Sequence, residues 1–276
     1  MGLRIISLAE NTAAREDLRQ EPGLSLLLEW RDKTILLDTG ASDAFLENGA
    51  ILGKDLAQLD YVVLSHGHSD HSGGLRALCR GDKRRFKLVL NPHFFDKKFV
   101  RDQEYLRYIG NDFAEEFLRT ANVMTIFPLK DTFQLEEGVY ILSDFAREAS
   151  FEVEAHNFVA LRGGSYDADQ FLDEQALVFD LPQGLAVVTA CGHNGIVNIC
   201  EAARRRLGRP IYAVIGGFHT KESGNERLER TAAYFQEQKI ARIACGHCTG
   251  DRAKACLEAA ATEALSLAAG SEILLD

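Results

Sequence analysis

Long apolar runs are missing from this chain of 276 residues, because no uninterrupted stretch reaches the roughly 18 residues that a membrane-spanning helix needs. Residues 1–8 are followed at once by Glu10 and a charged stretch, unlike a signal peptide, and no lipidation motif stands out at either end. Six cysteines do not make a disulfide framework in a chain of this size. These absences predict a cytoplasmic protein with free thiols that does not bind membranes.

Basic residues are also few, since Lys and Arg number 31 against 41 Asp and Glu, which gives a net charge of −10. A surface this acidic is a poor match for the phosphate backbone of a nucleic acid, so we expect no nucleic-acid partner. A hydrophobic fraction of 46% excludes collagen-like, mucin-like and disordered chains. Linkers, low-complexity segments and short repeats are absent, which predicts one domain over residues 1–276.

The order of the expected elements is strands first and then strands alternating with helices, in both halves of the chain. Strands are predicted at residues 3–8, 23–30, 33–38, 61–64, 87–90, 124–127, 139–142, 174–180, 185–190, 211–215 and 241–244. Helices are predicted at residues 43–52 with Ser42 as N-cap, 73–79, 198–207 and 226–238, and from Thr249 or Asp251 to Gly270. Residues 93–120 are expected to be helical or irregular, and residues 162–173 to be a loop. This order predicts an α/β protein with sheets inside and helices outside.

Three histidines and an aspartate gather directly after the predicted strand 61–64, in the sequence Ser-His-Gly-His-Ser-Asp-His-Ser-Gly-Gly. Alternate residues of an extended segment point the same way, so His66 and His68 can reach one ion together. Asp70 and His71 follow as the chain turns and can face a second position. Imidazole nitrogen and carboxylate oxygen suit zinc, iron or manganese, and a merely solvated turn would have no use for so many imidazoles.

The His-x-His-x-Asp-His motif after a buried strand resembles the central motif of the metallo-β-lactamase superfamily. The segment Ile-Leu-Leu-Asp-Thr-Gly at residues 35–40 resembles the strand and turn that precede this motif in the superfamily. The resemblance implies a four-layer αββα sandwich of two similar halves in a single domain. It also implies that Asp38 is a carboxylate that orients the metal ligands.

Further motifs are similar to one branch of that superfamily, the 7,8-dihydropterin-6-yl-methyl-4-(β-D-ribofuranosyl)aminobenzene 5′-phosphate synthase-like proteins. These motifs are Glu10-Asn11, Gly23-Leu24-Ser25, Asp173-Glu174-Gln175-Ala176-Leu177, residues 191–198 (Cys-Gly-His-Asn-Gly-Ile-Val-Asn), Gly216-Gly217-Phe218-His219 and His247-Cys248-Thr249-Gly250. They cover nearly the whole chain, yet they do not specify a substrate.

The resemblance implies one or two divalent metal ions per chain, with zinc preferred over manganese, iron or magnesium. Besides His66, His68, Asp70 and His71, it points to His193 as the third imidazole of the first site and to His247 for the second.

The chain departs from the superfamily at Cys191, near the place where many members have an aspartate that bridges two metals. We predict that Cys191 ligates a metal or lies beside the ligands, with a buried free cysteine as the alternative. Asp169 and Asp173 are fallback ligands, and the competing interpretation places them in a solvated loop.

His219 follows two glycines after a predicted strand, so its imidazole can contact a phosphate, act as an acid or simply belong to the core.

The Cys245-Gly-His-Cys248 segment resembles a thiol-disulfide redox motif. Ala244 precedes it, however, where such motifs usually carry Trp, and the segment also fits the last ligand motif of the branch. His156 has no supporting context.

We therefore expect a metal-dependent hydrolase or transferase that acts on a small, anionic, phosphorylated or ester-type metabolite, with Asp70 and His219 as catalytic residues. In the hydrolase version, the metal activates water and Asp70 orients it. In the version that the branch implies, the metal holds a pterin diphosphate while an aromatic carbon displaces pyrophosphate. The alternatives are a non-catalytic metal- or ligand-binding protein on the same fold, and a disulfide oxidoreductase. The homo-oligomeric state stays open.

Overall fold

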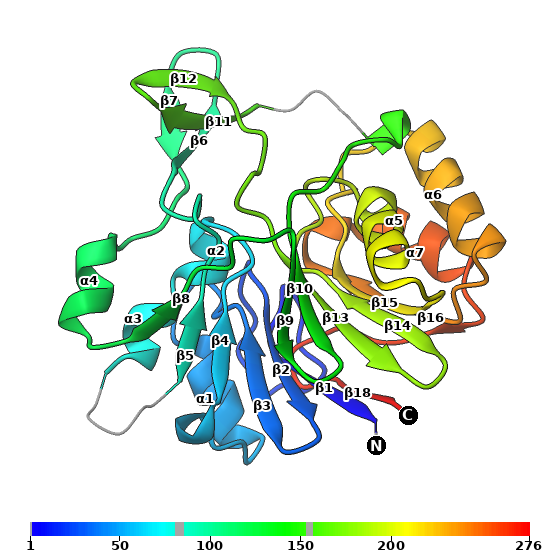
Figure 1. The fold of residues 1–276 in the computed structure, drawn as a ribbon, viewed down its shortest axis with the longest axis horizontal. Helices are drawn as coiled ribbons and strands as arrows, with labels where there is room; N and C mark the ends of the chain where they lie inside the picture. Colours follow the sequence, from blue (N-terminus) through cyan, green and yellow to red (C-terminus); the bar gives the residue numbers. More distant parts are fainter. Residues whose placement is uncertain (1, 81–85, 153–156) are drawn as a thin grey trace.

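The computed structural model describes residues 2–80, 86–152 and 157–276, and two large mixed sheets packed against each other form its centre (Figure 1). The first sheet has the order β18 (Glu272–Leu275), β1 (Leu3–Ala9), β2 (Ser25–Trp30), β3 (Lys33–Leu37), β4 (Tyr61–Val63), β5 (Lys87–Val89) and β8 (Met124–Ile126). The second has the order β17 (Glu263–Ala264), β16 (Arg242–Gly246), β15 (Ile211–Gly217), β14 (Gly184–Val188), β13 (Ala176–Leu181), β10 (Val139–Leu142) and β9 (Thr132–Glu136).

Helices cover the outer faces of both sheets, so that the domain has four layers (Figure 1). Beside the first sheet lie α1 (Ala44–Ile51), η1 (Leu56–Gln58), α2 (Ser69–Ser72), α3 (Leu75–Leu78) and α4 (Glu115–Thr120). Beside the second lie η2 (Ser150–Glu152), α5 (Ile196–Leu207), α6 (Asn225–Glu237), η3 (His247–Thr249) and α7 (Asp251–Glu258). The αββα sandwich that the motifs implied is confirmed.

Three hydrophobic clusters hold these layers together. The central one lies between the sheets and includes Leu28, Val63, Phe179 and Val188, all at most 1% exposed. The other two lie between each sheet and its helices. Strands such as β14 are buried on both faces, which explains why their sequences are continuous apolar runs rather than alternating ones.

Parallel pairing brings the loops that follow β3, β4 and β5 together, and likewise those that follow β14, β15 and β16. Parallel strands end at the same edge of a sheet, and in open α/β sheets that edge is where ligands bind. The His- and Asp-rich segments all follow these strands, so the fold collects them in one region.

A four-stranded antiparallel sheet stands apart from the sandwich at the top of Figure 1 and corrects two predictions. It contains β12 (Ser165–Ala168), β11 (Phe158–Arg162), β6 (Lys97–Arg101) and β7 (Leu106–Tyr108). Residues 93–120 are thus partly strand, and the predicted loop 162–173 contains β12. The ring of Phe99 packs against those of Tyr108 and Tyr166, so aromatic side chains from distant segments stabilise this accessory sheet.

The last helix also differs from the prediction, because α7 ends at Glu258 instead of continuing to Gly270. The residues beyond it form β17 and β18, and β18 pairs with β1, which places the C-terminus beside the N-terminus (Figure 1).

At α1 the N-cap is Asp43 rather than Ser42, although the Ser42 hydroxyl still accepts a hydrogen bond from the Ala44 amide. Within the described ranges, no helix combines the length and apolar character needed to span a membrane.

Candidate metal centre

Three imidazoles, those of His66, His68 and His193, converge where β4 and β14 end. One nitrogen atom from each lies within 4.8 Å of those of the other two, and His66 Nε2 is 3.0 Å from His68 Nδ1. His68 Nε2 and both ring nitrogens of His193 are buried and have no hydrogen-bond partner among the described residues. Buried polar atoms are normally paired, so this trihistidine group has the donor atoms and the vacant lone pairs that a metal ion requires.

Burial also keeps these three imidazoles uncharged. It lowers the pKa of His68 to about 3 and holds the pKa values of His66 and His193 well below the usual value for histidine. Only the neutral imidazole offers a lone pair to a cation, so the trihistidine group is in its metal-binding form at neutral pH.

A second set, the Asp70 group, consists of Asp70, His71 and His247. Asp70 Oδ2 lies 3.7 Å from His71 Nε2 and 3.6 Å from His247 Nε2, and the two imidazole nitrogens are 3.1 Å apart. Burial lowers the pKa of His71, but the carboxylates of Asp70 and Asp38 outweigh it and raise the pKa to about 9. The carboxylates therefore favour positive charge at this place, where a divalent cation would also be favoured.

Asp38 is fully buried and connects the strand β3 with the histidine loop. Its Oδ2 atom lies 2.7 Å from both His71 Nδ1 and the Ser65 hydroxyl, and its Oδ1 accepts a hydrogen bond of 2.7 Å from the Ser65 amide. A carboxylate on Nδ1 fixes the orientation of the ring and leaves Nε2 directed at the candidate centre.

Two further carboxylates position the histidines that come from the second half of the chain. Glu174 accepts hydrogen bonds from the His193 amide at 2.7 Å and from the Asn194 amide at 2.8 Å. Glu10 accepts one of 2.6 Å from the His247 amide, and Asn11 Oδ1 lies 3.0 Å from His247 Nδ1. The Glu10-Asn11 motif is thus distant in sequence but adjacent in space to His247.

Cys191 lies beside the candidate ligands, as the sequence predicts. Its Sγ atom is 3.2 Å from His71 Nε2, and it can share an ion with His66 and His71. Burial raises the pKa of this thiol. The sulfur therefore lies within reach of an ion held by His66 and His71.

His219 and Cys248 lie on the other side of Cys191. The His219 amide donates a hydrogen bond of 3.2 Å to Cys248 Sγ, which in turn donates one of 3.4 Å to the Cys191 carbonyl. Burial lowers the pKa of His219, but the neighbouring Cys248 outweighs it and raises the value. Cys245, by contrast, packs in the core between the second sheet and its helices, which does not favour disulfide exchange through the Cys245–Cys248 motif.

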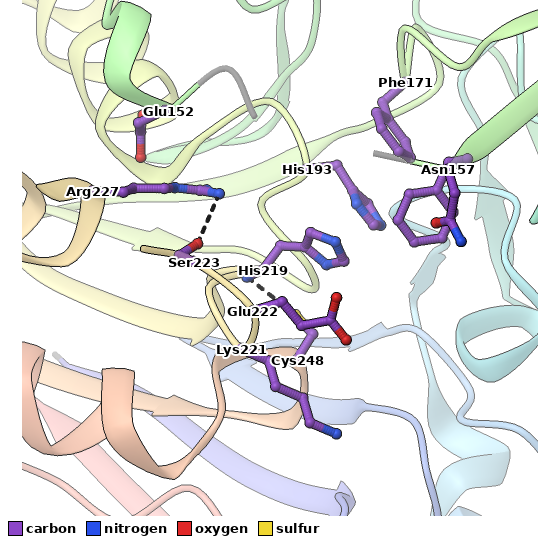
Figure 2. A pocket seen from close by; sticks show the side chains of 11 residues that line it. Glu152, Asn157, Phe171, His193, His219, Lys221, Glu222, Ser223, Arg227 and Cys248 are labelled. Atoms are coloured by element: carbon purple, nitrogen blue, oxygen red, sulfur yellow. Dashed lines mark hydrogen bonds between the residues drawn. The ribbon is translucent and has the colours of Figure 1, made fainter. Parts of the chain in front are cut away.

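A cavity of about 800 Å³ opens next to His193, one member of the trihistidine group (Figure 2). One wall is aromatic, since Phe171 stacks on His193 with ring centroids 4.1 Å apart and Phe158 lies 5.5 Å from His219. The remaining lining is polar and consists of Glu152, Asn157, Lys221, Glu222, Ser223, Arg227 and Cys248. The cavity can therefore accommodate a small molecule with both a flat ring and an anionic group.

Asp169 and Asp173 are neither solvated loop residues nor members of the two histidine groups, which corrects both interpretations. Each is fully buried, and Lys98 Nζ donates hydrogen bonds of 2.7 Å to Asp169 and 2.6 Å to Asp173. Asp173 Oδ2 also accepts a hydrogen bond of 2.7 Å from the Gly67 amide, inside the histidine loop. Asp173 therefore positions the loop, and neither carboxylate belongs to the donor set of the loop.

The sequence motifs do not include Lys98, Phe158 and Phe171, because nothing in the sequence distinguishes a buried lysine or a cavity wall from ordinary residues of those types. Glu174 could have been identified, since it lies within the Asp-Glu-Gln motif of the resembled branch. His156 lies outside the described residues.

Comparison with known proteins agrees with this geometry. Residues 18–107 match the model of the metallo-β-lactamase superfamily. A solved metal-dependent hydrolase of the β-lactamase superfamily has a TM-score of 0.86 and 29% identity, with 98% of each chain covered. The chain belongs to the metallo-β-lactamase superfamily.

Among its relatives is the 7,8-dihydropterin-6-methyl-4-(β-D-ribofuranosyl)-aminobenzene-5′-phosphate synthase of Methanocaldococcus jannaschii. The two are 28% identical over 91% of this chain and 89% of the synthase. An uncharacterized protein of the same archaeon is 30% identical over 89% of this chain and 90% of its own length. The similarity to the synthase branch that the motifs indicated is thus confirmed.

Proposed function

We propose that the protein is a metal-dependent enzyme that acts on a small anionic metabolite bound in the cavity beside the trihistidine group. The observation that carries this proposal is the convergence of three buried, uncharged imidazoles, among which His68 Nε2 and both ring nitrogens of His193 lack partners among the described residues. His66, His68 and His193 would hold one divalent ion, and Asp70, His71 and His247 would hold a second. An ion there would polarise a phosphoryl or carbonyl oxygen and acidify a bound water.

The protein's own residues would supply orientation and proton transfer. The Asp70 carboxylate accepts a proton or orients the nucleophile from its position next to His71 and His247. His219 faces the cavity with a raised pKa, so its imidazole can donate a proton to a leaving group. Lys221 and Arg227 line the same cavity and provide positive charge for an anionic group of the substrate.

Two reactions fit this site, hydrolysis of a phosphorylated or ester-type metabolite and transfer from a pterin diphosphate. The aromatic wall of Phe158 and Phe171 favours a substrate with a planar ring, as does the similarity to the synthase. Release of pyrophosphate from a dihydropterin diphosphate only when an aminobenzene acceptor is present would identify transfer. Product formation without the acceptor would identify hydrolysis.

Elemental analysis of purified protein tests the metal centre directly. We expect near-stoichiometric transition metal or magnesium, and loss of most of it in a His66→Ala, His68→Ala double variant. His93→Ala is the matched control, because His93 is half-exposed and pairs with Asp96 away from the centre. Equal metal content in the double variant and the control would contradict the proposal.

Activity assays separate an enzyme from a non-catalytic binding protein on the same fold. Phosphodiesters, thioesters and lactams, each with added zinc, manganese or magnesium, cover the hydrolytic chemistry of the proposal. Turnover that Asp70→Ala abolishes would support catalysis. An intact metal content without turnover of any of these substrates or of the pterin diphosphate would favour the binding protein.

A further inference from the structure

Beyond the two histidine groups, the described residues contain another cluster of metal-binding side chains, made of two thiols and one imidazole. Ligand atoms of Cys191, His219 and Cys248 all lie within 4.8 Å of one another. The three residues follow the adjacent parallel strands β14, β15 and β16, respectively. We propose that they form a site for a thiophilic divalent cation such as Zn²⁺, separate from the trihistidine and Asp70 groups.

The backbone holds this cluster in place before any ion binds. The hydrogen bonds from the His219 amide to Cys248 Sγ and from Cys248 Sγ to the Cys191 carbonyl fix the second sulfur between the ends of the strands. Gly217 makes this close approach feasible, because a Cβ atom there would lie 2.7 Å from Cys248 Sγ and 2.2 Å from the Ala190 carbonyl oxygen. Ligands that are already in place lose little conformational entropy when an ion binds.

The donor set indicates the kind of ion. Thiolate sulfur and imidazole nitrogen are the preferred ligands of Zn²⁺, at about 2.3 Å and 2.0–2.1 Å, whereas magnesium and calcium require oxygen. His219 Nδ1 is buried and has no hydrogen-bond partner among the described residues, so a lone pair is available. Each cysteine would release its proton to solvent on binding, as thiol ligands do.

The position of the cluster determines what the site can reach. His219 and Cys248 line the 800 Å³ cavity, while Cys191 is 3% exposed and touches His71 on its other side. Three protein ligands would leave a fourth position open, which is typical of reactive zinc sites, and two of these three ligands line the cavity. An imidazole that ligates an ion cannot donate a proton, so occupancy would replace the proposed acid role of His219. The site itself does not depend on the proposed function.

Titration of the reduced, full-length protein with Co²⁺ tests the site, because thiolate ligands give Co²⁺ a near-ultraviolet charge-transfer band that histidine and carboxylate ligands do not. In the wild type we expect the band intensity that two thiolate ligands give. Cys248→Ser should show about half of that intensity, and the Cys191→Ser, Cys248→Ser double variant should show no band. Cys256→Ser, which changes a thiol on α7 outside the cluster, is the matched control and should keep the full band.

Two outcomes would overturn the proposal. A wild-type band equal to that of Cys248→Ser would show that Cys248 is not a ligand, and absence of any band would exclude both thiols. X-ray absorption of the zinc-loaded wild type gives a second readout that needs no variant, with two sulfur ligands per chain expected and one or none contradicting the site.

The His66→Ala, His68→Ala variant distinguishes this inference from the proposed function. If the band persists there, the thiol site is independent, whatever the fate of the trihistidine group. If the band disappears with those histidines, the thiolates serve that group and no separate site exists.

Discussion

Lys98 Nζ and Asp173 Oδ1 lie 2.6 Å apart in the protein interior, with both side chains fully buried. Lys98 belongs to the accessory sheet, and the other oxygen of Asp173 accepts a hydrogen bond from the amide of Gly67, between two candidate metal ligands. This ion pair therefore connects the accessory sheet to the loop that carries His66 and His68.

Replacement of Lys98 by methionine should destabilise the protein strongly. It would take the cation from the buried carboxylate of Asp173 and leave Asp169 with Arg162 alone, and removal of one partner from a buried ion pair costs about 3–5 kcal/mol. Denaturant unfolding should show this loss, whereas Lys97→Met, on the exposed neighbouring residue, should change stability by less than about 0.5 kcal/mol. Similar small effects of both substitutions would argue against the ion pair.

Glu174 should control metal affinity through His193. Glu174→Ala removes the acceptor of the His193 and Asn194 amides, so the backbone that carries the His193 ring loses its support, and loss of a group that orients a ligand lowers metal affinity by about 10- to 100-fold. Competition with a chelator measures the affinity. Glu174→Gln keeps one acceptor oxygen and should give an intermediate value, and an affinity unchanged in Glu174→Ala would show that the carboxylate does not position His193.

Glu152 should make stability depend on pH. Its side chain is 4% exposed, and burial raises its pKa from 4.5 to about 7. Between these values the folded state keeps a proton that the unfolded state releases, so the free energy of unfolding falls as pH rises from about 4.5 to 7. The free energy of unfolding should fall by roughly 3 kcal/mol over this pH range, because a pKa change of one unit corresponds to about 1.36 kcal/mol.

Unfolding of Glu152→Gln at pH 5 and pH 8 measures this contribution, because glutamine does not titrate. We expect the variant to gain stability relative to the wild type as pH rises. Glu116→Gln, at an exposed ion pair on α4, is the control for the substitution itself. A constant difference between wild type and Glu152→Gln across this range would mean that Glu152 does not titrate there.

Gly216→Ala should unfold or severely destabilise the protein. Gly216 has a φ of 126°, and a Cβ atom there would lie 1.8 Å from the Thr189 carbonyl oxygen. Gly208→Ala is the matched control, because Gly208 has a φ of 67° but no atom within 4 Å of the added Cβ, and should cost only about 1–2 kcal/mol for the left-handed backbone. Comparable melting temperatures for the two variants would show that the contact at Gly216 relaxes easily.

The local elements with the strongest sequence signals were predicted well. The buried strand β4, the helix α5 and the helix α6 lie within a few residues of their predicted positions, because a continuous apolar run and a helical period each leave one favourable way to bury the chain. The accessory sheet was not predicted, because β6 and β7 are short, charged and half-exposed and become strands only by pairing with each other and with β11. The strands β17 and β18 also depend on partners far away in the sequence.

The sequence by itself determined which side chains could bind a metal, since the density of histidine and aspartate after β4 has no structural use and its spacing sets His66 and His68 on one side of an extended segment. Only the tertiary structure decided how the remaining donors meet. His193, His219 and His247 follow three different strands, and parallel pairing brings the ends of those strands to one edge. It also decided that Cys248 lies next to Cys191, and that Asp173 faces Lys98 and the loop amide instead of water, because such contacts depend on the packing of whole sheets rather than on any local pattern.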